Sequence, residues 1–137
     1  MTALDKIHAA EADKACERHR RVQMSPIKVY IAGPMRSDPD HVEKFNDATT
    51  QLRAAGLRVF NPSEECPEPK DKPSTLEFRR RVFALDTMWI SLQADILALL
   101  PGWEKSKGAV AERALAEAIG IPVRLFNPDT GVLGDAS

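Results

Sequence analysis

A chain of 137 residues is long enough for one domain with a hydrophobic core and too short for two domains of ordinary size. Lysine and arginine total 19 against 20 for aspartate and glutamate, so no cationic excess is available to bind a nucleic-acid backbone or a membrane surface. The longest apolar run, residues 96–100, is far shorter than the roughly 20 residues of a membrane helix, and the chain opens without a signal-peptide pattern. The sequence therefore predicts a cytoplasmic protein that binds a small molecule rather than nucleic acid or a membrane.

Cysteine usage excludes two further kinds of site. The two cysteines, Cys16 and Cys66, lie neither in CxxC spacing nor beside a histidine cluster. A zinc site or a disulfide framework needs one of those patterns. We therefore expect two free thiols, no metal site and no cofactor.

The first part of the chain differs in composition from the rest. Residues 1–24 are rich in alanine and charged residues, lack glycine and proline, and carry only a weak helical stripe of apolar side chains. After Met24 the composition changes to that of a folded domain. The sequence predicts an N-terminal helical extension over residues 1–24 and one α/β domain over residues 25–137.

Within that domain, strand and helix patterns alternate. The predicted strands are apolar or β-branched runs, and they cover residues 27–32, 57–61, 94–100 and 122–126. The predicted helices have apolar residues three and four positions apart, and they cover residues 40–55, 74–93 and 108–119. Ser74 or Thr75 is expected to cap the second helix. Residues 61–73, which hold four prolines, are expected to form a loop, and the tail from residue 128 is expected to be loose at its end.

This alternation predicts a doubly wound α/β fold. Each strand is a near-continuous apolar run, which is typical of parallel strands that are buried on both faces. We expect a flavodoxin-like or Rossmann-like parallel sheet of four to five strands, flanked by helices. Ligands of such sheets bind beyond the carboxyl ends of the strands. The loops expected at the site cover residues 33–38, 61–73, 101–107 and 127 onward.

Two acids lie on otherwise apolar helix faces. The residues three and four positions from Glu112 are glycine, alanine and leucine, and the corresponding neighbours of Asp86 are large and apolar. Glu117 differs, because Arg113 lies one turn before it and offers an ordinary surface ion pair. Each unpaired acid could simply reach water from the edge of the apolar stripe, but the two together favour a functional site.

Glycosidic chemistry uses a pair of carboxyl groups in this way. One carboxylate opposes or bonds to an oxocarbenium-like carbon, while a second acid manages protons or orients the substrate. Glu112 lies about one turn into its predicted helix, where the helix dipole favours an anion. We therefore expect Glu112 to be held in its ionised form as a nucleophile or an electrostatic stabiliser.

The segments "KVYIAGPMR" and "GWEKSKGAVAERALAEA", with an acid in the helix between them, resemble the nucleoside 2-deoxyribosyltransferase superfamily. That superfamily also includes the nucleoside 5′-monophosphate N-glycosidases, and the resemblance runs from about residue 28 to residue 126. It implies that Glu112 is the nucleophile that attacks the anomeric carbon, that Tyr30 positions this carboxylate, and that Asp86 orients the substrate or assists protonation of the departing base. It also implies a retaining mechanism through a glycosyl-enzyme ester.

The resemblance further implies a 5′-phosphate on the substrate. Transferases of the family often carry a carboxylate six residues before the nucleophile, whereas the N-glycosidases carry a serine, as this chain does at Ser106. The N-glycosidases also carry an arginine three residues after the glycine of the first loop, which here is Arg36. Together they could hold a phosphate, although Ser106 could be a simple helix cap and Arg36 a solvated loop residue. The predicted substrate-binding residues on these two loops are Gly33, Pro34, Met35, Arg36, Ser106 and Gly108.

Two more residues are candidates for the site. Trp103 lies on a ligand-side loop and could stack on the base or pack against the neighbouring loop. The resemblance implies a homo-oligomer, so Asn127 could reach the site of a neighbouring subunit. It could equally belong to an ordinary Asn-Pro-Asp turn.

The preferred interpretation is an N-glycosidase that cleaves the N-glycosidic bond of a (deoxy)nucleoside 5′-monophosphate. One alternative is a nucleoside 2-deoxyribosyltransferase, which would move the sugar between bases through the same glutamate. The other alternative is a non-catalytic nucleotide-binding module, since related parallel-sheet domains act as sensors.

Overall fold

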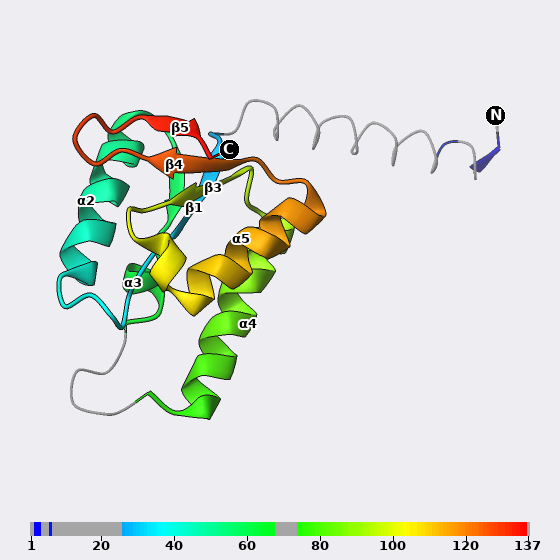
Figure 1. Ribbon diagram of the computed structural model, residues 1–137. Helices are drawn as coiled ribbons and strands as arrows, with labels where there is room; N and C mark the ends of the chain where they lie inside the picture. The colour runs from blue at the N-terminus through cyan, green and yellow to red at the C-terminus, as the bar shows by residue number, and fades with distance from the viewer. Residues whose placement is uncertain (1, 4–5, 7–25, 68–73, 137) are drawn as a thin grey trace.

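The computed structural model describes residues 2–3, 6, 26–67 and 74–136 (Figure 1). The predicted N-terminal extension, with Cys16, lies almost wholly outside these residues, as does the second half of the loop expected at 61–73. None of the helices in the described ranges is both long enough and apolar enough to span a membrane.

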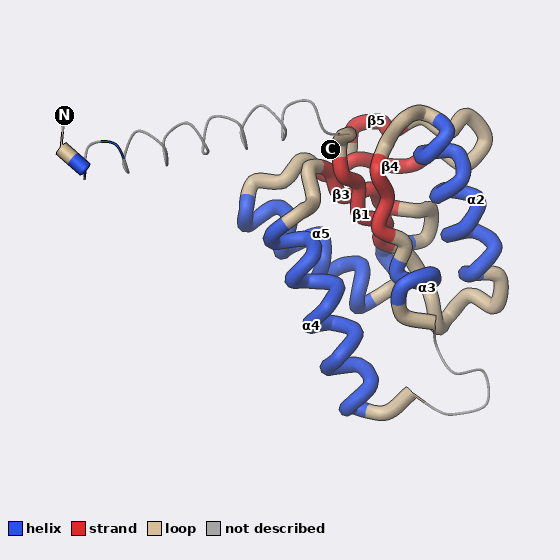
Figure 2. Tube along the Cα trace, turned by 180° about the vertical axis from the view of Figure 1, so that it is seen from behind, coloured by secondary structure: helices blue, strands red, loops and turns tan. Residues whose placement is uncertain are grey.

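Five strands form one mixed sheet at the centre of the domain (Figures 1 and 2). In spatial order they are β2 (Arg58–Phe60), β1 (Lys28–Ala32), β3 (Ile96–Leu99), β4 (Val123–Phe126) and β5 (Leu133–Asp135). The first four are parallel, as their apolar runs predicted. The predicted α/β sheet is therefore confirmed, and its strand order is that of the flavodoxin-like class.

The fifth strand corrects two expectations. We expected every strand to be parallel and no strand in the tail from residue 128, but β5 pairs antiparallel with β4, with Gly134 opposite Leu125. The connection is a hairpin in which the Asn127 N–H donates to the Val132 carbonyl at 3.0 Å and Gly131 adopts a positive φ of 72°. A strand of three residues, one of them glycine, shows too little alternation to be predicted from its sequence.

Helices cover both faces of the sheet. The helix α2 (His41–Ala54) lies on one face, while α4 (Leu76–Leu92) and α5 (Lys107–Ile119) pack together on the other (Figures 1 and 2). Alternate residues of β1 serve the two halves of the core. Val29 and Ile31 pack with α2, whereas Tyr30 packs with α4 and α5.

A short helix, α3 (Pro62–Glu65), lies where we expected only a loop. Its cap is Asn61, a fully buried residue whose Oδ1 accepts a hydrogen bond from the Ser63 N–H at 2.9 Å. Proline suits the first helical position, because the N–H that it lacks has no partner within the helix. The cap and the proline therefore form a helical turn directly after β2, at the ligand end of the sheet.

The strand order reverses between β1 and β3, and such a reversal opens a crevice at the carboxyl ends of the two strands. Gly33 follows β1 directly, and a Cβ atom there would lie only 2.9 Å from the Cβ of Leu100, just after β3. Glycine therefore lets the two loops start close together. A side chain at this position would force them apart.

Candidate active site

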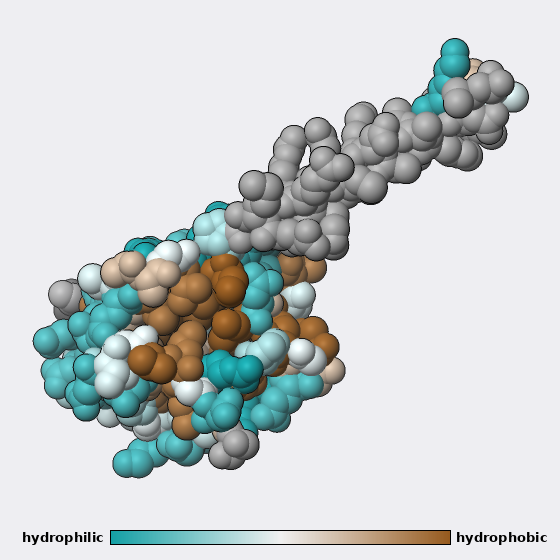
Figure 3. Space-filling model, turned by 90° about the horizontal axis from the view of Figure 1, so that it is seen from above, coloured by the Kyte–Doolittle hydropathy of each residue, from teal (hydrophilic) through white to brown (hydrophobic). Residues whose placement is uncertain are grey.

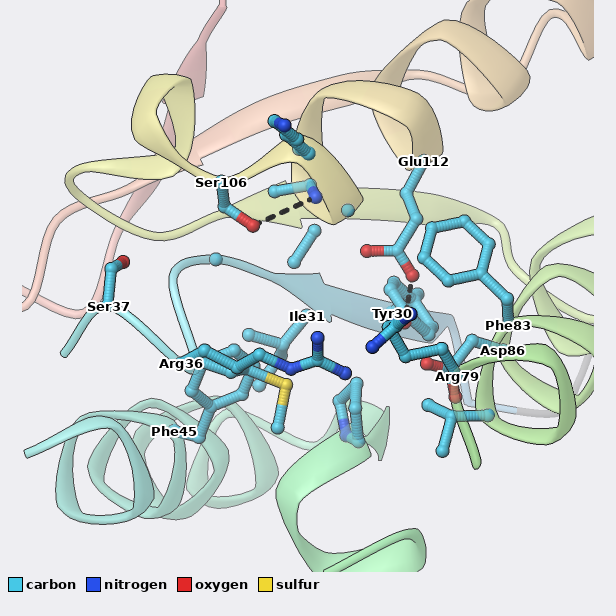
Figure 4. Close-up of a pocket in the computed structure, with 18 of the residues that line it drawn as sticks. Tyr30, Ile31, Arg36, Ser37, Phe45, Arg79, Phe83, Asp86, Ser106 and Glu112 are labelled. Atoms are coloured by element: carbon cyan, nitrogen blue, oxygen red, sulfur yellow. Dashed lines mark hydrogen bonds between the residues drawn. The ribbon is translucent and has the colours of Figure 1, made fainter. Parts of the chain in front are cut away.

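A pocket with a volume of about 560 Å³ occupies that crevice (Figure 4). Its walls come from the end of β1 and the loop after it, from α4, and from the N-terminal half of α5. In Figure 4, Ser106 lies on one side of the pocket, while Arg79, Phe83 and Asp86 of α4 lie on the other. A cavity of this size is typical of small-molecule sites.

Tyr30 and Glu112 meet at the wall that the sheet and α5 share. Tyr30 occupies a β1 position that faces α4 and α5, and Glu112 lies on the inner face of α5 with the buried Ala109 and Ala116. The Tyr30 hydroxyl donates a hydrogen bond to Glu112 Oε2, drawn as a dashed line in Figure 4. Glu112 is only 6% exposed, so this hydroxyl replaces water as its partner.

Asp86 approaches the same tyrosine from α4. It is 5% exposed, and its Oδ1 has no hydrogen-bond partner among the residues that the structure describes. The Tyr30 ring is held by Phe60, with 5.4 Å between ring centroids, and by Trp89, with 6.2 Å. A buried carboxyl oxygen without a partner is costly, and this one belongs to a residue of the pocket wall, which makes Asp86 a candidate functional residue.

Burial makes both carboxyl groups weaker acids than they would be in water, because it raises their pKa values. It raises the pKa of Glu112 to about 8, against the Tyr30 hydrogen bond and with help from the negative charge of Asp86. Burial likewise raises the pKa of Asp86 to about 6, again against Tyr30. The pKa of Tyr30 lies well above its ordinary value, first because of burial and then because of the charge on Glu112. At neutral pH the two carboxyl groups therefore hold about one proton between them.

This protonation state differs from the ionised Glu112 that we expected. Glu112 is the sixth residue of α5, whereas the helix dipole acts mainly within the first turn. Burial outweighs the dipole and leaves the carboxyl group of the free protein largely protonated at neutral pH. A positive charge that develops beside Glu112 would reverse this balance, because it favours the carboxylate.

The N-terminus of α5 faces the pocket and offers a site for an anion. Ser106 caps the helix, with its Oγ accepting a hydrogen bond from the Ala109 N–H at 3.2 Å. Arg36 extends from the loop after β1 toward the centre of the pocket (Figure 4). First-turn N–H groups together with an arginine suit a phosphate. The predicted binding residues that the structure brings to this pocket are Gly33, Met35, Arg36, Ser106 and Gly108.

Three residues predicted for the site do not line this pocket. Trp103 packs against the core shared by β3 and α5, and the guanidinium carbon of Arg113 lies 4.7 Å from its ring centroid. Pro34 lies against Gly102 instead. The Asn127 side chain accepts a hydrogen bond from the backbone N–H two residues on, at 2.9 Å, and so closes a turn after β4. For Asn127 this placement matches the turn alternative, whereas Trp103 packs against the core and Arg113 rather than against the neighbouring loop that the sequence suggested.

One wall of the pocket was not predicted from the sequence. Arg79, Val82 and Phe83 line it together with Asp86, all from α4. Positions 79, 82 and 86 recur at helical spacing on one face. That spacing was a usable signal once Asp86 had been chosen.

Comparisons with known proteins identify the family. A family model described as "Domain of unknown function (DUF4406)" matches residues 27–125. The solved structure of a 2-deoxyribosyltransferase from the psychrotolerant bacterium Bacillus psychrosaccharolyticus is 31% identical over 74% of this chain and 72% of that chain, with a TM-score of 0.59. The chain belongs to the nucleoside 2-deoxyribosyltransferase superfamily.

A second match supports the fold of this superfamily member. A conserved protein from Enterococcus faecalis V583 is 20% identical over 74% of this chain and 64% of that chain, with a TM-score of 0.52. A comparison with curated proteins gave no match. The superfamily membership predicted from the two sequence segments is thus confirmed.

Proposed function

We propose that this superfamily member is an N-glycosidase that cleaves the N-glycosidic bond of a (deoxy)nucleoside 5′-monophosphate. The observation that carries the proposal is that one pocket contains both a cluster of carboxyl groups and a site suited to an anion. The cluster of Tyr30, Glu112 and Asp86 can act on a glycosidic bond. The α5 N-terminus, with Arg36 across from it, can hold a phosphate.

The first step forms a glycosyl-enzyme ester. The carboxylate of Glu112 attacks the anomeric carbon, the C–N bond breaks, and the departing base takes the proton of Asp86. The reactive arrangement therefore has the shared proton on Asp86 and none on Glu112. Positive charge on the sugar in the transition state favours that arrangement, and the Tyr30 hydroxyl holds the carboxylate in place.

The second step hydrolyses the ester. Water attacks the anomeric carbon, gives a proton to the ionised Asp86, and displaces the Glu112 carboxylate. Two displacements at the same carbon leave its configuration unchanged. The products are the free base and a sugar 5-phosphate, and both acids return to their starting states.

The phosphate binds at the other part of the pocket. The Lys107 and Gly108 N–H groups in the first turn of α5 and the Ser106 hydroxyl donate hydrogen bonds to its oxygens, and the helix dipole adds attraction. Arg36 can donate two parallel hydrogen bonds to the same group. Binding energy from the phosphate then holds the anomeric carbon against Glu112.

Base release from a panel of nucleotides tests the proposal. The protein should release free base from at least one nucleoside 5′-monophosphate, and much more slowly from the matching nucleoside. Glu112→Gln should lower kcat by a factor on the order of 10³ or more, because it removes the nucleophile and keeps the shape of the side chain. Chromatography of the products measures both effects.

A matched control and an adduct make the test specific. Glu117→Gln changes a carboxylate on the same helix that pairs with Arg113 at 2.8 Å on the surface, so it should keep full activity. Mass spectrometry of protein quenched during turnover should show a sugar-phosphate adduct on Glu112. Turnover that survives in Glu112→Gln, or the absence of base release from every nucleotide, contradicts the proposal.

The 31% identity to a 2-deoxyribosyltransferase favours a second candidate, transfer of the sugar from one base to another. That relative is described as a biocatalyst for the synthesis of nucleosides. Both reactions use the same ester and differ in what accepts the sugar. Adding a second free base to the assay separates them, because a transferase forms a new glycosidic bond with it. Nucleotide binding without any turnover would support the non-catalytic module instead.

We also infer that the chemistry belongs to residues 25–137, outside the extension of residues 1–24, and that the protein works in the cytoplasm as a homo-oligomer. Three apolar side chains on one face of α4 support association, since Leu85, Met88 and Leu92 are 38%, 54% and 72% exposed. Figure 3 shows apolar side chains gathered on one face of the molecule among polar ones. Contiguous apolar patches are typical of interaction surfaces.

A further inference from the structure

The α4 wall of the pocket is not used by the proposed phosphate site. Among the described residues, α4 contributes Arg79, Val82, Phe83 and Asp86 to the lining. When the anomeric carbon lies at Glu112 and the phosphate lies at the α5 N-terminus, the base of the substrate faces this wall. The side chains of this wall would then contact the base.

Val82 and Phe83 give the wall an apolar surface. Phe83 is 38% exposed and lies beside Glu112 in Figure 4, so part of its ring is open to the pocket. The ring also reaches across to α5, because a Cβ atom on Gly108 would lie 3.5 Å from it. An aromatic ring at this place suits stacking on a nucleotide base.

Arg79 supplies donors at the far end of the same wall. It lies seven residues before Asp86 on one helix face, which places it about 10.5 Å away along the helix axis. Its Nη1 donates a hydrogen bond to the Ser74 carbonyl at 2.9 Å, which holds the side chain and leaves other N–H groups of the guanidinium available. Among the described residues, no carboxylate forms a salt bridge with Arg79.

We propose that Arg79 selects guanine as the base of the substrate by donating two parallel hydrogen bonds to O6 and N7. The inference rests on the proposed function, because it takes the pocket as a nucleotide site. Guanine presents two adjacent acceptors that match the fork of a guanidinium, whereas adenine presents an acceptor beside an amino donor. Cytosine also has adjacent acceptors, O2 and N3, but O2 is bonded to the carbon beside the glycosidic nitrogen, whereas O6 of guanine lies on the second ring, farther from the sugar. A cytosine held at the same anomeric carbon would therefore extend its acceptor pair less far toward Arg79, which lies about two turns from Asp86 along α4.

Nucleotide binding to the full chain carrying Glu112→Gln, which blocks turnover, tests this inference. Isothermal titration calorimetry gives Kd values for GMP, AMP, CMP and ribose 5-phosphate. GMP should bind about 10-fold or more tightly than AMP and CMP. Adding Arg79→Gln or Arg79→Lys should reduce that preference to about two-fold or less, because neither side chain keeps the guanidinium fork. The Kd of ribose 5-phosphate should stay the same.

Arg80→Gln is the matched control. Arg80 is the next residue of α4, is exposed, and does not line the pocket, so this variant should keep the preference for GMP. Equal binding of GMP and AMP by the parent, or a preference that persists in Arg79→Gln, overturns the inference. Equal weakening of every nucleotide and of ribose 5-phosphate also overturns it and makes Arg79 a phosphate ligand.

Failure of the proposed function gives a different result. A protein that binds GMP selectively through Arg79 but releases no base supports base selection and rejects the N-glycosidase. A protein that releases base from every nucleotide with the same kcat/KM, whether or not Arg79 is present, rejects base selection alone. Arg79 is exposed, so its substitution should leave the fold intact, and circular dichroism of each variant checks this.

Discussion

After burial, the hydroxyl of Tyr30 has the largest influence on the pKa of Glu112. Its hydrogen bond lowers the pKa of a carboxyl group that burial raises to about 8. Tyr30→Phe should therefore raise that pKa further, and the acidic limb of the profile of kcat/KM against pH should move to higher pH. At pH 7 we expect a loss on the order of 10-fold or more, with partial recovery in more alkaline buffer.

The shape of the profile separates this effect from a change in packing. Trp89→Phe alters a ring that contacts Tyr30 but leaves the hydroxyl in place. The acidic limb of the kcat/KM profile of this variant should therefore stay at the pH of the parent. If Tyr30→Phe lowers the rate equally at every pH, the hydroxyl does not control the ionisation of Glu112.

Individual residues of the candidate site could be predicted where their chemistry differed from that of their neighbours on the helix. Glu112 and Asp86 stood out because no partner lies three or four positions away, and both are buried in the pocket wall. Arg79 gave no contrast, because it begins a run of three arginines that is typical of a solvated helix face. Its position seven residues before Asp86, on the same helix face, was the one available signal, but whether that end of the face reaches the pocket depends on how α4 packs against α5.

Two helix caps form a natural pair for testing the α5 N-terminus. Ser106 caps α5 and Thr75 caps α4, and each side-chain oxygen accepts a hydrogen bond from a backbone N–H of its helix. Only Ser106 lines the pocket. Ser106→Ala and Thr75→Ala should each lower the free energy of unfolding by about 1 kcal/mol, measured by urea denaturation. Ser106→Ala alone should also weaken the binding of ribose 5-phosphate in a calorimetric titration. Equal affinity in the two variants would leave Ser106 as a structural cap.

Length separates the elements that could be predicted from those that could not. The three long helices end within two residues of the predicted bounds, because their apolar positions recur over several turns. The elements α3 and β5 have four and three residues, too few to show a period. They depend on contacts from elsewhere in the chain. Asn61 is held by Asn46 of α2 at 3.0 Å, and β5 exists only as the partner of β4.

The domain as a whole should lose stability as the pH rises. The pKa values of about 8 for Glu112 and about 6 for Asp86 lie above the ordinary values of 4.5 and 3.8 that apply to the unfolded chain. Between these limits the folded state binds more protons than the unfolded state, so the free energy of unfolding falls with increasing pH. The slope from one such group can approach ~1.4 kcal/mol per pH unit.

Glu112→Gln removes the larger of the two contributions. The variant should show a flatter pH dependence than the parent and should be more stable than the parent at pH 8, although we expect it to be inactive. Denaturant unfolding at several pH values between about 5 and 8 measures this. Glu117→Gln, on the exposed side of α5, should keep the slope of the parent. A parent whose stability stays constant or rises over this range contradicts the assignment of two buried weak acids.

The two outer strands of the sheet have a consequence for how copies of the chain meet. Both β2 and β5 have three residues, and they carry the exposed Arg58 and Asp135. Long uncharged edge strands invite other chains to add a strand and so begin a fibril, whereas short charged edges discourage it. Copies can therefore associate through helices, such as the apolar exposed side of α4, without joining sheet to sheet. A concentrated solution of this protein should form closed assemblies in preference to fibrils.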